Sequence, residues 1–198
     1  MRNAVKKALV VLCHPNKTGF KQAIAEKAVQ ELSRDYHVDF LDLYRSSFSP
    51  VLPPDELPRR FSFDETVLTY SELVKNASVF VFVHPDWWGG PPALLKGFID
   101  RVFRPGFAYD FEGNEFLSSR KVELLAGKQA FVFNTTDYTR PDGLYPPAEI
   151  WKTNIFSYCG IPDAQIYTFF DTYHSTYEAR HAWIESVGTK LRQSLTLV

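Results

Sequence analysis

The amino-acid sequence predicts an α/β fold in which a five-stranded parallel sheet carries helices on both faces. Five short apolar segments alternate along the chain with five segments whose apolar residues recur at helical spacing. Strands that alternate with helices pair in parallel, because each helix returns the chain to the start of the next strand. Most of the apolar segments are continuous rather than alternating, which indicates strands buried on both faces.

The elements follow one another in a regular order. The expected strands lie at 8–13, 37–43, 78–83, 127–134 and 164–170. The expected helices lie at 20–34, 66–76, 92–103 and 147–158, followed by a last helix with an apolar residue at every fourth position from Ala179 to Leu195. The proline-rich segment 48–60 interrupts this order and is expected to run over the surface.

Length and composition indicate one globular domain over residues 1–198. Apolar residues make up 45% of the chain and charged residues 23%, which is the balance of a soluble protein. The net charge of −1 gives no reason to expect nucleic acid or an anionic membrane surface as a partner. No apolar run approaches the roughly 20 residues of a membrane-spanning helix. The apolar run before His14 is too short for a secretion signal and is interpreted as the first strand.

The two cysteines, Cys13 and Cys159, lie far apart, each inside an apolar segment. This placement argues against a disulfide scaffold and indicates a reducing, cytoplasmic setting. Neither cysteine has the spacing to a histidine that a metal site requires, so no metal is expected.

Two unusual loops fall where such a fold binds its ligand. An open parallel sheet binds ligands beyond the carboxyl ends of its strands, at the point where the strand order reverses. In one of the two common strand orders of such folds, 2-1-3-4-5, that point lies at strands 1 and 3. The loops that follow these strands are HPNKTGF at 14–20 and HPDWWGGPP at 84–92.

The first loop leads from a buried strand into a helix. The unpaired N–H groups at a helix start suit a phosphate. Thr18 offers a hydroxyl and an N-cap, Gly19 permits close approach, and His14 or Lys17 can add a donor. A phosphate site and an ordinary capped helix start both explain these residues. The loop lacks the glycine spacing of the dinucleotide fingerprint and of the P-loop.

The second loop favours a flat ligand. Trp87 and Trp88 can plug the end of the sheet, but Gly89 and Gly90 expose backbone N–H groups beside the two rings. A planar heteroaromatic ring that lies on tryptophan and binds backbone amides uses all of these features. A third loop, at 134–138, follows the fourth strand and is expected to close the same crevice, although its residue types are common in loops.

The segment PDWWGGPPALLKG at 85–97, with DRVF at 100–103 and GFAY at 106–109, resembles the NAD(P)H quinone oxidoreductase family. The family has a flavodoxin-like fold and includes quinone reductases, modulators of drug activity and general-stress oxidoreductases. The resemblance extends from His14 to the last helix. It implies a flavin as the flat ligand, FAD with FMN as the alternative, and NAD(P)H as the reductant.

The resemblance also implies which residues contact the flavin and the substrate. The phosphate and the ribityl chain are expected beside the first loop, the isoalloxazine ring on the second loop with its far edge at the third, and the adenosine half of FAD at an arginine. The cofactor-binding residues implied in this way are His14, Thr18, Gly19, Phe20, Lys21, Pro85, Asp86, Trp87, Trp88, Gly89, Thr135, Thr136, Asp137, Tyr138 and Arg180. The implied catalytic residues are Tyr109 and Phe111, which border the substrate pocket in relatives, often from the partner subunit, and Tyr145, which can stand in for a tyrosine of the proton relay.

Three positions depart from the family pattern. Gly19, Phe20 and Lys21 stand where relatives usually carry Ser-Phe-Asn, so a hydroxyl contact to phosphate is lost and a lysine charge is gained. Asp137 and Tyr138 replace a pair of glycines. No histidine follows Tyr145 before position 174, although the best-studied relatives pair the tyrosine with a histidine.

The expected function is reduction of quinones or similar small electrophilic acceptors by two-step hydride transfer from NAD(P)H through the flavin. A homodimer is expected, with segment 48–60 contributing to the contact. One alternative is an electron-transfer flavodoxin with FMN, although such carriers are strongly acidic for docking and this chain is nearly neutral. The other is a regulatory protein that binds a membrane transporter and has little quinone reductase activity.

Overall fold

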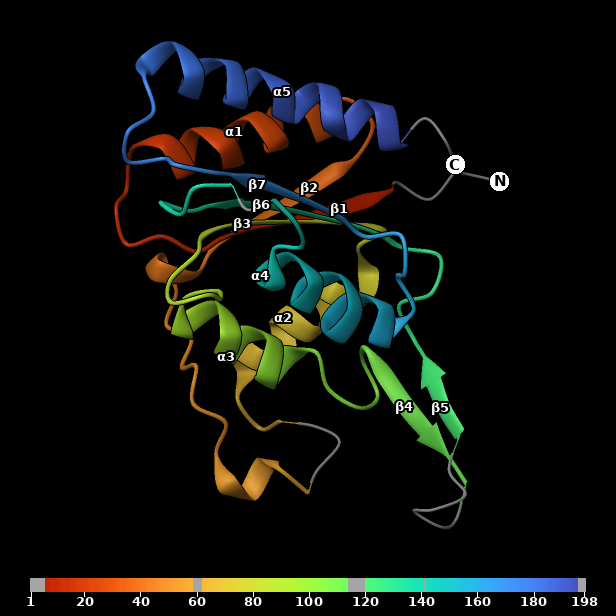
Figure 1. Cartoon of the computed structure of the whole chain (residues 1–198). Helices are drawn as coiled ribbons and strands as arrows, with labels where there is room; N and C mark the ends of the chain where they lie inside the picture. Colours follow the sequence, from red (N-terminus) through yellow and green to blue (C-terminus); the bar gives the residue numbers. More distant parts are fainter. Residues whose placement is uncertain (1–5, 59–61, 114–119, 141, 196–198) are drawn as a thin grey trace.

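The computed structural model describes residues 6–58, 62–113, 120–140 and 142–195, and it contains a parallel sheet between two layers of helices (Figure 1). The sheet has five strands in the order β2-β1-β3-β6-β7, and all neighbouring pairs are parallel. The strands are β1 (Lys7–Leu12), β2 (His37–Asp42), β3 (Val79–Pro85), β6 (Gln129–Thr135) and β7 (Gln165–Phe169). The predicted fold class and strand order are confirmed, because only the strand numbers differ.

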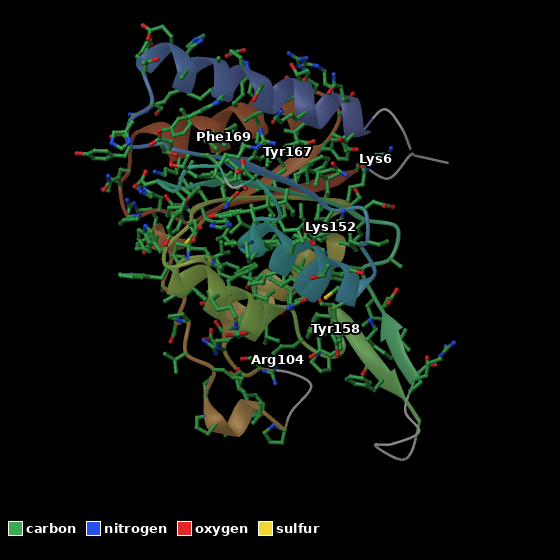
Figure 2. The ribbon with its side chains drawn as sticks, in the orientation of Figure 1. Lys6, Arg104, Lys152, Tyr158, Tyr167 and Phe169 are labelled. Atoms are coloured by element: carbon green, nitrogen blue, oxygen red, sulfur yellow. The ribbon has the colours of Figure 1, made fainter. Side chains whose placement is uncertain are left out.

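Helices cover both faces of the sheet. The helices α1 (Phe20–Leu32) and α5 (Tyr177–Leu195) lie on one face, and α2 (Glu65–Asn76), α3 (Ala93–Val102) and α4 (Pro146–Glu149) lie on the other (Figure 1). Alternate residues of each strand fill two separate apolar cores, so Val81 faces α1 and α5 while Phe82 faces α3. Figure 2 shows Tyr167 and Phe169 of β7 on the α1 and α5 side, and Tyr158 on the opposite side.

The expected helix at 147–158 differs from the observed structure. After the four residues of α4, a π-helix spans Ile150–Phe156 and a 3₁₀ turn spans Ser157–Cys159. A π-helix bonds residue i to residue i+5, so it brings residues five apart to the same side. Trp151 and Phe156 use this geometry, since both rings are buried and stack with centroids 5.5 Å apart.

A hairpin of β4 (Tyr109–Glu112) and β5 (Arg120–Glu123) was absent from the expected elements. Its strands have four residues each, and most of their side chains are polar. Strands this short give no apolar run or clear alternation, so the sequence carries little signal for them.

The proline-rich segment is partly buried, which corrects the expectation of a surface excursion; its residues 59 and 60 lie outside the described part of the chain. Glu56 is 4% exposed and forms ion pairs with Arg101 at 3.0 Å and Arg104 at 3.2 Å. Arg101 of the DRVF motif and Arg104, which follows the motif, therefore bind this segment, because a buried carboxylate needs charge partners. Pro50 lies so close to Gly97 of α3 that a Cβ atom on the glycine would come within 2.3 Å of it.

We predict that Gly97→Ala destabilises the protein by about 1–3 kcal/mol, although alanine favours a helix, because the added methyl group overlaps Pro50. The free energy of unfolding from urea denaturation measures the effect. Gly143→Ala is the matched control, since a Cβ atom there meets nothing within 4 Å. Equal stability of Gly97→Ala and the wild type would contradict the close packing of the segment on α3.

Candidate functional site

The loops after β1, β3 and β6 meet at the carboxyl edge of the sheet, as expected from the parallel strand direction. The Asp86 N–H donates to the Thr135 carbonyl at 2.7 Å, which joins the second loop to the third. The Thr136 N–H donates to the Phe169 carbonyl at 2.9 Å, and the Thr136 hydroxyl accepts from the Tyr138 N–H at 3.2 Å. Backbone hydrogen bonds therefore fix the relative positions of these loops.

The first loop leaves the start of α1 open. Gly19 is the N-cap residue, with a φ of 120°, and no side chain caps the helix, so the expected Thr18 cap is not formed. The N–H groups of the first turn therefore lack a side-chain acceptor. Thr18, Gly19, Phe20 and Arg180 line one cavity of about 490 Å³, so the structure brings these four predicted residues together. The Phe20 ring also packs against Trp183, with centroids 5.9 Å apart.

Three charged side chains gather beside this cavity. Burial lowers the pKa of Lys21, while the nearby Asp137 carboxylate raises it and the Arg180 guanidinium lowers it. Arg180 donates from Nε to the Ser175 hydroxyl at 2.8 Å and from Nη2 to the Thr172 carbonyl at 2.9 Å. These two bonds fix its guanidinium on the α5 side of the cavity.

His14 lies at the start of the same loop. Burial lowers its pKa, and the Lys21 charge lowers it further. Its Nδ1 accepts from the Asn16 N–H at 3.2 Å, which leaves Nε2 to carry the proton of the neutral ring. His14 is therefore suited to donate one hydrogen bond rather than to supply a positive charge.

Trp88 does not plug the end of the sheet. Its side chain is 99% exposed, and that of Trp87 is 43% exposed. Trp88 has a φ of 58° and Gly89 a φ of 78°, and the turn is closed by a 2.8 Å bond from the Trp87 N–H to the Gly90 carbonyl. A left-handed backbone costs a tryptophan roughly 1 kcal/mol or more. The fold thus holds a large aromatic ring in solvent at an energetic cost.

Asp86 and Tyr145 are hydrogen-bonded to each other. The Tyr145 hydroxyl donates to Asp86 Oδ2, while Oδ1 is buried without a direct hydrogen bond. Burial raises the pKa of the Asp86 carboxyl, and the N–H groups of Gly90 and Gly89 and the Thr136 hydroxyl lie near enough to oppose this in part. The carboxyl group sits at the junction of the second and third loops.

Sequence reasoning missed a row of polar residues at the strand ends. His84, Asn134 and Thr168 are paired in register across β3, β6 and β7. Thr168 donates to Asn134 at 2.6 Å, while His84 Nε2 and Asn134 Nδ2 are buried without a hydrogen-bond partner. His84 is 1% exposed, and burial lowers its pKa to about 4. The only signal in the sequence is the place of His84 and Asn134 at the ends of apolar strands.

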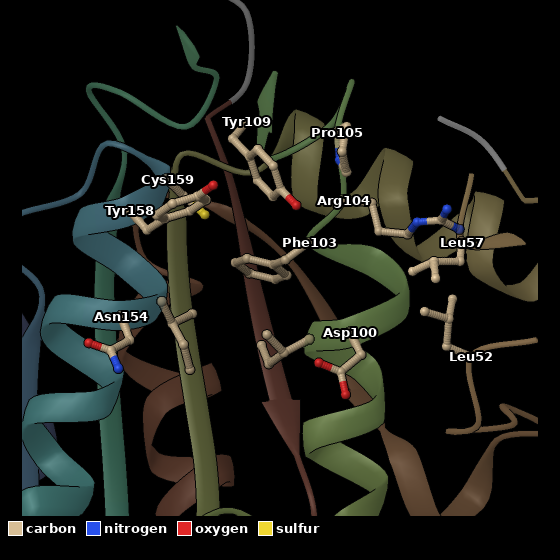
Figure 3. A pocket seen from close by; sticks show the side chains of 12 residues that line it. Leu52, Leu57, Asp100, Phe103, Arg104, Pro105, Tyr109, Asn154, Tyr158 and Cys159 are labelled. Carbon is tan, nitrogen blue, oxygen red and sulfur yellow. The ribbon is translucent and has the colours of Figure 1, made fainter. Parts of the chain in front are cut away.

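Tyr109 and Phe111 lie far from the three loops of the same chain. They belong to β4, and β5 leads directly into the turn before the first residue of β6, so the hairpin lies near the amino ends of the strands. Tyr109 packs against Tyr158, with centroids 5.0 Å apart, and against Phe111 at 5.8 Å. With Phe103 it lines a second cavity of about 290 Å³ (Figure 3).

The residues at the carboxyl edge fit a flavin. An exposed aromatic ring on a strained turn offers a stacking surface. The uncapped start of α1 offers N–H groups for a phosphate. The unpartnered Asp86 Oδ1 offers an acceptor beside the glycine N–H groups that can donate to a ring.

No helix in the described part of the chain is long and apolar enough to cross a membrane.

Comparison with known proteins gives concordant matches. The model of the family described as flavodoxin-like fold matches residues 6–193. An uncharacterized NAD(P)H oxidoreductase of Haemophilus influenzae is 33% identical over 198 residues, covering 95% of each chain. Human ribosyldihydronicotinamide dehydrogenase (quinone) is 33% identical over 156 residues, covering 69% of this chain and 65% of that protein. The crystal structure of Smu.1420 from Streptococcus mutans is similar with a TM-score of 0.82 and 30% identity, covering 94% of this chain and 99% of that one.

We predict that His84 makes the stability of the protein fall as the pH drops from the ordinary histidine pKa of 6.5 to about 4. In this pH range His84 binds a proton in the unfolded chain but stays neutral in the folded protein. The free energy of unfolding therefore falls by roughly 3 kcal/mol across the range. Urea denaturation at several pH values measures it, and His84→Gln should flatten the dependence. His37→Gln, at an exposed position, is the control. An unchanged pH dependence in His84→Gln would contradict a neutral, buried His84.

Proposed function

This chain belongs to the flavodoxin-like fold family, and on that premise we propose that it is a flavin-dependent NAD(P)H oxidoreductase that reduces quinones or similar small acceptors by two electrons. The chain is an oxidoreductase, because relatives named NAD(P)H oxidoreductase align with more than nine-tenths of it. The observation that carries the flavin proposal is the fully exposed Trp88 on a left-handed turn at the carboxyl edge.

The second loop binds and orients the ring system. Trp88 offers one face for stacking, and the N–H groups of Gly89 and Gly90 offer donors to the polar edge. A flavin, when bound, supplies the centre that takes up a hydride from NAD(P)H and passes it to the acceptor.

The first loop holds the phosphate end. The free N–H groups at the start of α1 attract an anion, and Thr18 and Lys21 add a hydroxyl and a charge. The cavity continues from Gly19 to Arg180 and Tyr177 of α5. A space of this extent, with an arginine and an aromatic ring at its far end, favours FAD over FMN.

Both thiols of the chain support a reducing, cytoplasmic setting. Cys13 and Cys159 are free and buried, and burial raises the pKa of Cys13 to about 12 and that of Cys159 to about 11. Neither is therefore suited to disulfide exchange.

A homodimer completes the proposed substrate site. Tyr109 and Phe111 lie near the amino ends of the strands, away from the three loops of their own chain. They can border the acceptor only if a second copy presents its hairpin to the carboxyl edge of the first.

The visible absorption spectrum of the purified protein, before and after addition of NADPH without oxygen, tests the function. We expect a flavin spectrum that bleaches in one two-electron step. Trp88→Ala should raise the Kd of the flavin about 10- to 100-fold, since stacking of a planar ring on an aromatic side chain contributes roughly 1–3 kcal/mol. Phe40→Ala removes an exposed ring from β2 and should leave the Kd unchanged.

Other spectra would decide against this function. A flavin that NADPH does not reduce would favour the regulatory protein, and a stable one-electron semiquinone would favour the electron carrier. A protein that binds no flavin under any condition would leave Trp88 without a ligand and end the proposal.

Complementation between two variants tests the dimer. We expect Trp88→Ala and Tyr109→Ala each to lose activity, and a mixture of the two refolded together to regain part of it. Each mixed dimer then contains one site with both residues intact. Sedimentation that shows only monomers at micromolar concentration, or mixed dimers without recovered activity, would contradict a site shared between subunits.

A further inference from the structure

Four side chains with polar atoms lie together on one face of the sheet, where the apolar core ends. His84, Asn134 and Thr168 stand in register across β3, β6 and β7. Because side chains alternate along a strand, His84 points to the same face as Phe82, and its neighbours in register share that face. Trp151 of the π-helix packs on this face, and its ring centroid lies 5.4 Å from that of His84.

Three of these polar atoms have no hydrogen-bond partner among the described residues. They are Nε2 of His84, Nδ2 of Asn134 and Nε1 of Trp151. Each of the three residues is only 1% exposed, so bulk solvent does not reach these atoms. Buried polar atoms in folded proteins nearly always have a hydrogen-bond partner, which is another residue or an ordered water molecule. The three atoms therefore require a partner at this end of the core.

The role of His84 Nε2 follows from the other nitrogen of the ring. His84 Nδ1 lies 2.8 Å from the Pro85 carbonyl oxygen, which can only accept a hydrogen bond. Nδ1 therefore carries the proton of the ring. Burial lowers the pKa of His84 to about 4, so at neutral pH the ring holds no second proton. Nε2 is therefore an acceptor.

The other two atoms are donors. The Thr168 hydroxyl donates to Asn134 Oδ1 at 2.6 Å, which places the amide oxygen on the β7 side. Because β6 lies between β3 and β7, Nδ2 on the opposite side of the amide faces His84. Nδ2 and Nε2 nevertheless form no direct hydrogen bond. Trp151 Nε1 can only donate, so the group presents two donors and one acceptor.

We propose that one buried water molecule binds between His84, Asn134 and Trp151. The water oxygen accepts from Asn134 Nδ2 and from Trp151 Nε1, and one of its O–H groups donates to His84 Nε2. This arrangement satisfies all three atoms at once. Three hydrogen bonds to polar groups that otherwise lack a partner are the usual number for a buried water.

The same three atoms select water over an ion. A metal ion needs a lone pair from each ligand, whereas Nδ2 and Nε1 present hydrogen atoms to the site. An anion would meet the lone pair of Nε2, and a buried charge without an opposite charge costs far more free energy than a neutral polar group. A small neutral molecule that both accepts and donates satisfies the site, and water is the smallest.

The water has a route of entry and a structural role. Thr168 lines a cavity of about 550 Å³ and is bonded to Asn134, so the site lies one side chain away from that cavity. The water joins the π-helix, through Trp151, to the ends of β3 and β6. His84 and Asn134 lie where the second and third loops begin, so one water helps to hold both loops against the helix layer. This role does not depend on the proposed oxidoreductase function.

A high-resolution crystal structure of the whole chain tests the site directly. We expect one water oxygen at roughly 2.7–3.2 Å from each of His84 Nε2, Asn134 Nδ2 and Trp151 Nε1. Absence of electron density between the three atoms, or a direct hydrogen bond from Nδ2 to Nε2, would overturn the proposal.

NMR spectroscopy tests the same site in solution. The Trp151 indole proton should give a cross-peak to bound water, and the ring nitrogens of His84 should show the proton on Nδ1. His84→Phe removes the acceptor and should abolish the cross-peak. Trp183→Phe, on the opposite face of the sheet, is the matched control and should retain it. A wild-type spectrum without the cross-peak, or with the His84 proton on Nε2, would count against the water.

Urea denaturation at neutral pH measures the coupling between the residues. His84→Phe and Asn134→Leu should each raise the equilibrium constant for unfolding about 10-fold, because each leaves the remaining polar atoms unpaired. The double variant removes an acceptor and a donor together, so its effect should fall about 10-fold short of the product of the two single effects. His84→Phe combined with Ser71→Ala should show no such shortfall, since the Ser71 hydroxyl bonds the Val67 carbonyl within α2.

The three experiments decide together. Independent effects of His84→Phe and Asn134→Leu would mean that the two residues share no partner, which contradicts the water. If either variant does not fold, the crystal structure and the NMR spectrum of the wild type decide on their own.

Discussion

The common direction of all five strands is the constraint on which the rest of this structure depends. Because every pair in the sheet is parallel, every strand ends at the same edge, and each return crosses a face of the sheet as a helix. In the three central strands, β1, β3 and β6, the interior residues are apolar and buried, so polar chemistry there is confined to the strand ends. Loops distant in sequence therefore meet at one edge, and the row of His84, Asn134 and Thr168 marks where the apolar core stops.

The second loop exposes an aromatic ring at a cost in folding stability. A tryptophan gains most free energy when its ring is buried, yet Trp88 is exposed and has a left-handed backbone. The hydrogen bonds of Asp86 to Thr135 and of Trp87 to Gly90 hold this turn in place without any contact to the Trp88 ring. Strain that persists in this way is typical of ligand sites, where the ligand supplies the missing contacts.

The sequence predicts those parts of the structure that depend on local pattern. Apolar runs and helical spacing suffice for the five strands of the sheet and for four of the helices, and the strand order common to such folds suffices to bring the loops after β1, β3 and β6 together. The β4–β5 hairpin and the π-helix are too short or too irregular for such patterns. The burial of Glu56 against Arg101, and the bond from Tyr145 to Asp86, depend on pairing between residues 45 and 59 positions apart, which no local pattern encodes.

Two residues that depart from the family pattern, Lys21 and Asp137, interact electrostatically in the structure. Lys21 stands where relatives usually carry asparagine, and Asp137 stands where they carry glycine. Either charge alone would alter the field around a bound flavin, but the Asp137 carboxylate lies close enough to Lys21 to raise its pKa. Because the opposite charges of the two side chains partly cancel, this pair adds little net charge beside the first and third loops, while Arg180 adds one positive group. The Asp137 carboxylate is thus an electrostatic partner of Lys21 across the first and third loops, and the two departures are to be considered together rather than singly.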